Sequence, residues 1–146
     1  MDHSMNAASV CVTQSVRLEL IDPNGAATPI EAQLSYDPQD PYAVTAIFQT
    51  GRAEVAWTFG RELLCQGIYE PSGDGDVHVW PCLDADGHAV VIIELSSPDG
   101  EALVQTRTGD VRAFVDRMCR AVEPGTESAH LDVDATIAAI LEADAA

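Results

Sequence analysis

Apolar and polar residues alternate along the first part of the chain, which is the pattern of strands with one buried and one solvated face. Between residues 10 and 20, valine and leucine occupy most even positions, while threonine, serine, arginine and glutamate occupy the odd positions from 13 to 19. The same alternation predicts three further strands, over residues 30–36, 42–50 and 53–59. Short turns that contain proline, glycine or aspartate separate these strands, so they are expected to pair as antiparallel neighbours.

The pattern changes after residue 60. Residues 61–66 predict a short helix, and Gly67 is expected to end it from the C′ position just beyond its last residue. Residues 87–95 are apolar on both faces apart from their ends, which is typical of a strand covered on both sides. A turn at Pro98–Gly100 leads into a last predicted strand, at about residues 101–107.

Two helices are predicted at the end of the chain. Residues 110–121 place apolar side chains at steps of three and four, which indicates an amphipathic helix. Asp132 is expected to be the N-cap of a final helix whose apolar stripe consists of Ile137, Ile140 and Leu141.

These elements predict an α+β fold with about seven mainly antiparallel strands. Four strands precede the short helix, three follow it, and two C-terminal helices complete the chain. The sequence contains no linker, so one domain is expected over residues 1–146, with residues 1–9 disordered.

The stretch SGDGDVHVWP, residues 72–81, is best explained as a structural element. Gly73 and Gly75 are expected to permit positive φ angles in a tight loop. The strand after the loop supplies core or interface area through its valines and Trp80, and Pro81 is expected to mark the end of pairing at that edge.

The composition narrows the possible functions. The chain has 24 acidic residues against seven arginines and no lysine, and its formal net charge is −17. Such a field repels phosphate backbones, which argues against nucleic-acid binding. The N-terminus lacks the charge and apolar region of a signal peptide, and the longest apolar run, residues 89–93, is too short to span a membrane. Together with four scattered cysteines, this predicts a cytoplasmic protein without direct membrane insertion.

No motif in the sequence points to catalysis or to a cofactor. The glycine-rich loop leads into a strand rather than a helix, and no lysine is present, which excludes a phosphate loop. The acidic turns at Asp74–Asp76 and Asp84–Gly87 leave open an irregular calcium site at the surface. They do not form an EF-hand loop, because Ile93 would stand where that loop needs a bidentate glutamate. A transition-metal site at His78, Cys82 and His88 lacks the spacing of a zinc site. A Cys–His dyad that meets only in space also stays open, but the sequence predicts no enzyme, metal or cofactor.

Several segments resemble the SsgA-like family of sporulation-specific cell-division regulators. They are PSGDGDVHVWP (71–81), YDPQDPYAVTAIF (36–48), ELSSPDGEALV (94–104) and EPGTESAHLDVD (123–134), and they occur in the family's order. The resemblance covers about residues 10–142. One departure is His78, which stands where the family frequently has arginine.

The resemblance implies a non-enzymatic regulator that helps to place FtsZ at future sporulation septa and promotes its assembly. It also implies barrel-like sheets similar to those of the Whirly single-stranded-DNA-binding proteins, and a homotrimer. The implied partners are further copies of the chain, FtsZ and SsgA-type paralogues, and the implied location is the division septum. A Whirly-type nucleic-acid binder is the alternative, which the charge argues against.

No family motif assigns a binding role to a particular residue of this chain. Large aromatic side chains on strands and glycines at sharp turns are therefore the only candidates for structural or interface roles. These candidates are Tyr42, Trp57, Gly73, Gly75, Trp80 and Pro81.

Overall fold

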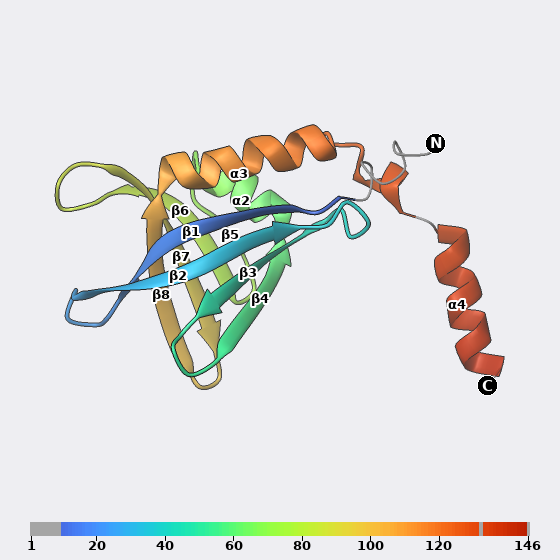
Figure 1. Cartoon of the computed structure of the whole chain (residues 1–146), viewed down its shortest axis with the longest axis horizontal. Coiled ribbons are helices and arrows are strands. Elements are labelled where there is room, and N and C mark those ends of the chain that lie inside the picture. The colour runs from blue at the N-terminus through green and yellow to red at the C-terminus, as the bar shows by residue number, and fades with distance from the viewer. Residues whose placement is uncertain (1–9, 132, 146) are drawn as a thin grey trace.

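In the part of the chain that the structure describes, eight antiparallel strands form one curved sheet in the order β4-β3-β2-β1-β8-β7-β6-β5 (Figure 1). The computed structural model describes residues 10–131 and 133–145, and the side chains of residues 10–131 and 137–143. The disorder expected for residues 1–9 and the N-cap expected at Asp132 lie outside the described residues. The strands are β1 (Val12–Ile21), β2 (Ala27–Tyr36), β3 (Ala43–Gln49), β4 (Glu54–Gly60), β5 (Ser72–Asp74), β6 (Val77–Leu83), β7 (Ala89–Ser97) and β8 (Gly100–Arg107).

The prediction of seven strands is wrong because it missed β5. These three residues pair with β6, so that Ser72 lies opposite Val79 and Asp74 opposite Val77. Gly75 and Asp76 form the turn between them, and Gly75 has a φ of 61°, the positive angle that the sequence predicts. A strand of three residues made of serine, glycine and aspartate has no apolar alternation from which it could be recognised.

The helices within the described residues are α2 (Arg61–Gly67), α3 (Thr108–Ala121), a short 3-10 helix η1 (Glu127–His130) and α4 (Val133–Ala145). Figure 1 shows α3 lying across one end of the curved sheet, with α2 close to it. The buried face of α3 consists of Val111, Phe114, Val115 and Met118, at the steps of three and four that the sequence predicts, while Cys119, expected on the same face, is half-buried. None of the described helices is long and apolar enough to cross a membrane.

The role predicted for Gly67 is wrong. Gly67 is the last residue of α2, and its φ is not positive. The C-cap is Ile68, which has a right-handed helical conformation, so no residue at this helix end needs a positive φ. The constraint comes from packing instead: a Cβ on Gly67 would lie 2.2 Å from Cγ1 and 2.6 Å from Cβ of Val79. The absence of a side chain therefore lets α2 approach β6 closely.

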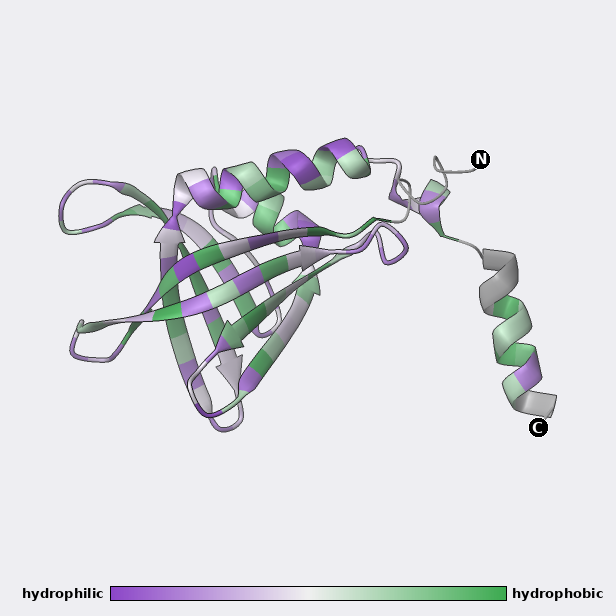
Figure 2. Ribbon diagram, in the orientation of Figure 1, coloured by the Kyte–Doolittle hydropathy of each residue, from purple (hydrophilic) through white to green (hydrophobic). Residues whose placement is uncertain are grey.

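The core lies on the concave face of the sheet, where one set of alternating residues is buried beneath α2 and α3. Figure 2 shows this alternation of apolar and polar residues along β1 and β2. Strand β7 differs, because Val91 and Ile93 belong to the core while Val90 and Ile92 are buried on the opposite face. The non-alternating apolar pattern of β7 thus reflects burial on both faces, as predicted.

Candidate functional site

Trp80 lies on the outer face of the sheet. Val77 and Val79 of β6 point into the core, so His78 and Trp80 point the other way. Trp80 is half-buried, lies opposite Ile92 of β7, and contributes to a shallow pocket of about 300 Å³. The sequence placed Trp80 either in the core or at a subunit contact, and its position on the outer face contradicts the first of these. An interface role for Trp80 stays a prediction.

Gly73 lines the same pocket. The reason why this position is a glycine differs from the one predicted. It belongs to β5, and its φ is not positive. Gly73 lies opposite His78, where an added Cβ would be only 2.1 Å from Cδ2 of the imidazole. The missing side chain makes room for this ring, whose Nδ1 lies 3.7 Å from Oε1 of Glu94.

Pro81 is also only partly as predicted. The pairing of β6 with β5 ends at Val79, close to the proline. Pairing with β7 continues past Pro81 as far as Leu83, which lies opposite Ala89. Pro81 therefore belongs to a section of β6 that has a neighbour on one side only.

A second site is built around Tyr42, a residue that is 51% exposed and lies immediately before β3. A groove of about 520 Å³ separates Tyr42 from the turn after α3. The groove is lined by Tyr42, Gly60, Arg61, Glu62, Cys65, Gln66, Pro124, Gly125 and Glu127. Trp57 does not reach this groove: it lies on β4, on the concave face, and packs against the edge of the core.

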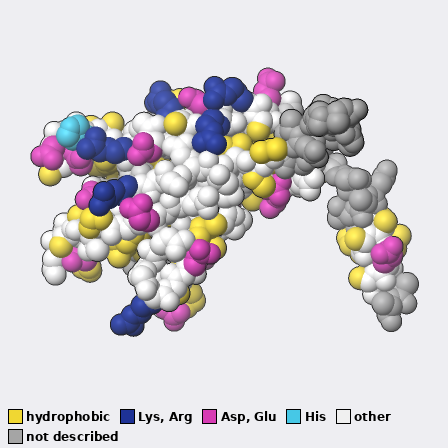
Figure 3. Space-filling model, viewed as in Figure 1, with side chains coloured by type: hydrophobic (Ala, Val, Ile, Leu, Met, Phe, Trp, Pro, Cys, Tyr) yellow, Lys and Arg dark blue, Asp and Glu magenta, His cyan; other side chains and the backbone are white. Residues whose placement is uncertain are grey.

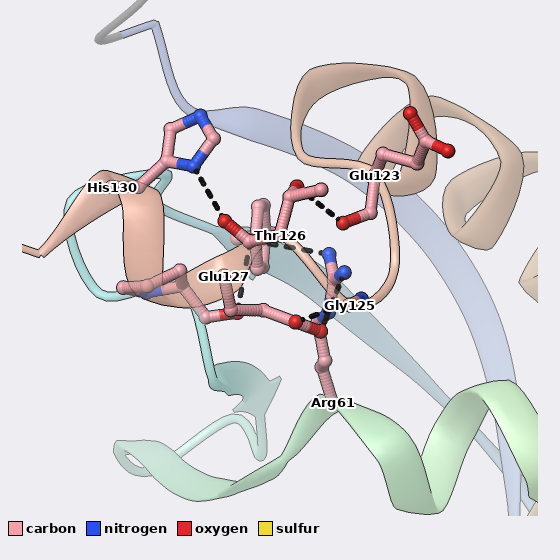
Figure 4. A network of polar contacts seen from close by, with 8 residues as sticks. Arg61, Glu123, Gly125, Thr126, Glu127 and His130 are labelled. Carbon is pink, nitrogen blue, oxygen red and sulfur yellow. Dashed lines mark hydrogen bonds and ion pairs between the residues drawn. The ribbon is translucent and has the colours of Figure 1, made fainter.

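A buried arginine holds the walls of the Tyr42 groove together (Figure 4). Arg61 is 3% exposed, and its Nε donates a hydrogen bond to Oε2 of Glu127 at 3.0 Å. Its Nη1 donates to the hydroxyl of Tyr36 at 3.2 Å, and that hydroxyl donates to the carbonyl of Pro41 at 2.9 Å. Its Nη2 lies 2.8 Å from the same Glu127 oxygen, but without the alignment of a hydrogen bond. The network links the start of α2, the end of β2 and η1.

Electrostatics keep this ion pair charged. The pKa of the Glu127 carboxyl is lowered, first by a hydrogen bond from its own backbone N–H and then by the hydrogen bond and charge of Arg61. The N–H of Gly125 also donates to Glu127, at 2.9 Å, which ties the carboxylate to the turn beside the groove. A buried guanidinium without such a partner would be strongly destabilising. Sequence reasoning missed the pair because arginine is usually exposed and 66 positions separate the partners.

The groove does not contain an activated nucleophile at Cys65. Burial, together with the neighbouring Cys119 thiol, raises the pKa of Cys65 to about 12. Cys65 is therefore a neutral thiol at physiological pH, and neutral thiols are poor nucleophiles.

The acidic turn before β7 brings three potential metal ligands together. Single ligand atoms of Asp84, Asp86 and His88 all lie within 4.8 Å of one another. However, Oδ1 of Asp84 already accepts hydrogen bonds from the backbone N–H groups of Asp86 and His88, both at 2.9 Å. These bonds are those of an ordinary aspartate-stabilised turn, and they lower the pKa of Asp84. The cluster is explained by the geometry of the turn.

Comparison with known proteins identifies the family. Residues 30–127 match the family model described as Streptomyces sporulation and cell division protein, SsgA. The chain is 44% identical to the sporulation-specific cell division protein SsgB of Frankia casuarinae, over 89% of this chain and 91% of the relative. It is also 44% identical to SsgB of Streptomyces coelicolor, over 94% of this chain and 98% of the relative. A solved SsgA-like sporulation-specific cell division protein of Thermobifida fusca matches with a TM-score of 0.81 at 40% identity, over 90% of this chain and 96% of that chain. The chain belongs to the SsgA family of sporulation and cell division proteins.

Proposed function

We propose that this protein is a non-enzymatic regulator that helps to position FtsZ at sporulation septa and promotes FtsZ assembly. The observation that carries the proposal is the match to SsgB of Streptomyces coelicolor, which covers 94% of this chain and 98% of the relative. A match along nearly the whole relative favours a shared role in sporulation-specific division. The protein acts from the cytoplasm, at the septum, as a homotrimer with a Whirly-type half-barrel, and SsgA-type paralogues are further partners.

The Tyr42 groove is the proposed FtsZ-facing surface. It offers an exposed aromatic side chain beside apolar surface, a combination that is frequent at the energetic centre of protein interfaces. The Arg61–Glu127 ion pair supports this role, because it fixes the groove walls before binding and so reduces the entropy lost on association. The neutral Cys65 thiol in the same groove supports binding rather than covalent chemistry.

A pelleting assay with purified FtsZ and GTP tests both parts of the proposal. The wild-type protein is expected to increase the amount of FtsZ polymer that sediments and to sediment with it. Tyr42→Ala is expected to weaken this effect about tenfold or more, which is typical for an aromatic anchor. Leu83→Ala is the matched control, since Leu83 is also apolar and exposed but lies at the far end of β6.

The two parts fail separately. If the wild-type protein neither sediments with FtsZ nor changes the amount of polymer, the proposed function is wrong. If Tyr42→Ala matches the wild-type protein while both act on FtsZ, the function stands and the assignment of the Tyr42 groove is wrong.

A further inference from the structure

The C-terminal helix α4 presents apolar side chains to solvent. Ile137, Ile140 and Leu141 are 48%, 61% and 62% exposed. Figure 1 shows α4 directed away from the sheet and from α3. Residues 135–141, ATIAAIL, contain no charged side chain, so this part of the helix has no strongly polar face. An isolated helix of this length is marginal in water, and a helix that is apolar on most sides is normally buried. Helix α4 therefore needs a surface to pack against.

Charge restricts what that surface can be. The segment that forms α4 carries three acidic residues, Asp134, Glu142 and Asp144, and no basic residue. Packing α4 against the same helix of another copy in parallel would bring these like charges together. A complementary surface must combine exposed apolar or aromatic area with positive charge, which is scarce in a chain of net charge −17.

The outer side of α3 has these properties. Four of the seven arginines of the chain lie between residues 107 and 120. Arg112, Asp116 and Arg120 are exposed and follow one another at steps of four along α3, so this face of the helix carries two basic residues and one acidic residue. Tyr69 is 66% exposed beside Arg112, whose guanidinium lies 5.3 Å from the centre of its ring. Figure 3 shows basic side chains over α3, with an acidic side chain among them. We call Tyr69, Arg112 and Arg120 the α3 surface.

We propose that α4 of one protomer docks on the α3 surface of a second copy of this chain. The isoleucines and Leu141 pack against Tyr69 and the aliphatic parts of the two arginines, while Glu142 pairs with a guanidinium. Such a contact joins two different surfaces, and repeating it gives a closed ring of three copies when each copy is rotated by a third of a turn from the last. The inference rests on the proposed oligomer and specifies which surfaces build it.

Sedimentation equilibrium of the full-length chain tests this contact. Ile140→Glu is expected to weaken self-association at least tenfold and to shift the mass toward that of the 15.5 kDa monomer. Leu83→Glu adds the same charge at an exposed apolar residue of the sheet and is the matched control, expected to keep the wild-type mass. If Ile140→Glu keeps the wild-type mass, or if the wild-type protein is a monomer at every concentration, the inference is overturned.

Charge reversal tests the choice of partner surface and does not depend on the apolar substitution. Arg120→Glu is expected to weaken association, and adding Glu142→Arg to the same chain is expected to restore at least part of it. If Ile140→Glu dissociates the protein but Arg120→Glu and Arg112→Glu do not, α4 packs elsewhere and the α3 surface is wrong. If Ile140→Glu leaves the mass unchanged but abolishes sedimentation with FtsZ, α4 binds FtsZ instead. If the wild-type protein is a monomer and still sediments with FtsZ, the contact and the proposed homotrimer are overturned, while the proposed action on FtsZ stands.

Discussion

Replacing Gly67 by alanine should destabilise the protein, although alanine is the better helix former. The new Cβ would lie 2.2 Å from Cγ1 and 2.6 Å from Cβ of Val79, well inside van der Waals contact. Val79 is 0% exposed and sits in a paired strand, so it cannot move aside without disturbing the core. Overpacking of this kind typically costs about 1–3 kcal/mol. The gain in helix propensity offsets about 0.5–1 kcal/mol of that cost, which leaves an expected net loss of up to about 2.5 kcal/mol.

The matched control is Gly109→Ala. Gly109 is also helical, lies in the first turn of α3, and has no heavy atom within 4 Å of the position that a Cβ would take. Alanine there is expected to be neutral or to stabilise by about 0.5–1 kcal/mol, chiefly through the unfolded chain. The two substitutions are chemically identical but are expected to have opposite signs.

Urea unfolding, followed by far-ultraviolet circular dichroism at one fixed protein concentration, measures both variants, because association would otherwise shift the apparent stability. A double-mutant cycle with Val79→Ala should reveal a coupling free energy of about 0.5–3 kcal/mol between the two positions. If Gly67→Ala proves as stable as the wild-type protein, α2 and β6 do not pack as closely as the structure shows.

Three further predictions concern the outer face, the charge and the ion pair. Trp80→Ala should cost about 1–3 kcal/mol in urea unfolding, less than the roughly 3–5 kcal/mol of a fully buried tryptophan, because Trp80 is half-buried; a larger loss would mean that another surface covers it. The protein should not bind a fluorescent dT oligonucleotide at about 0.15 M salt, because seven basic residues stand against 24 acidic ones; salt-sensitive binding in fluorescence anisotropy would contradict this. The pKa of Glu127 is lowered in the folded state, so its contribution to stability is present above the unfolded pKa of about 4.3 and is lost as pH falls through the folded pKa. Glu127→Gln should therefore lose less stability than the wild-type protein between about pH 5 and pH 3, and parallel stability curves would contradict the assigned pKa direction.

The sequence predicted those parts of the fold that depend on periodic apolar residues. The alternation in residues 10–20 and the continuous apolar run of β7 identify burial directly, because each position reports its own face. The predicted antiparallel arrangement followed from short turns between successive strands. A three-residue strand such as β5 has no such period, and its pairing depends on the Gly75 turn and on β6.

The candidate site was less predictable, because its features arise from contacts between distant segments. Tyr42 was a candidate as an aromatic residue on a strand, but nothing near it in sequence indicates that Glu127 would neutralise Arg61 beside it. Gly67 and Gly73 were recognised as unusual positions, yet for the wrong reason. Turn chemistry is local and can be read from sequence, whereas the contacts of these glycines with Val79 and His78 exist only after the strands have paired.

The two free edges of the sheet favour partners that bind through side chains rather than by adding a strand. Among the described residues the sheet begins with β4 and ends with β5, and no further described strand pairs with either edge. At one edge β5 is only three residues long, and the section of β6 beyond it contains Pro81, which has no N–H to donate. Short strands, proline and like charge are devices that prevent edge-to-edge aggregation, and the net charge of −17 adds repulsion between copies. Self-association and partner binding must then use surfaces where charge is absent or complementary. The Tyr42 groove and the exposed apolar side chains of α4 meet this condition better than the sheet edges do.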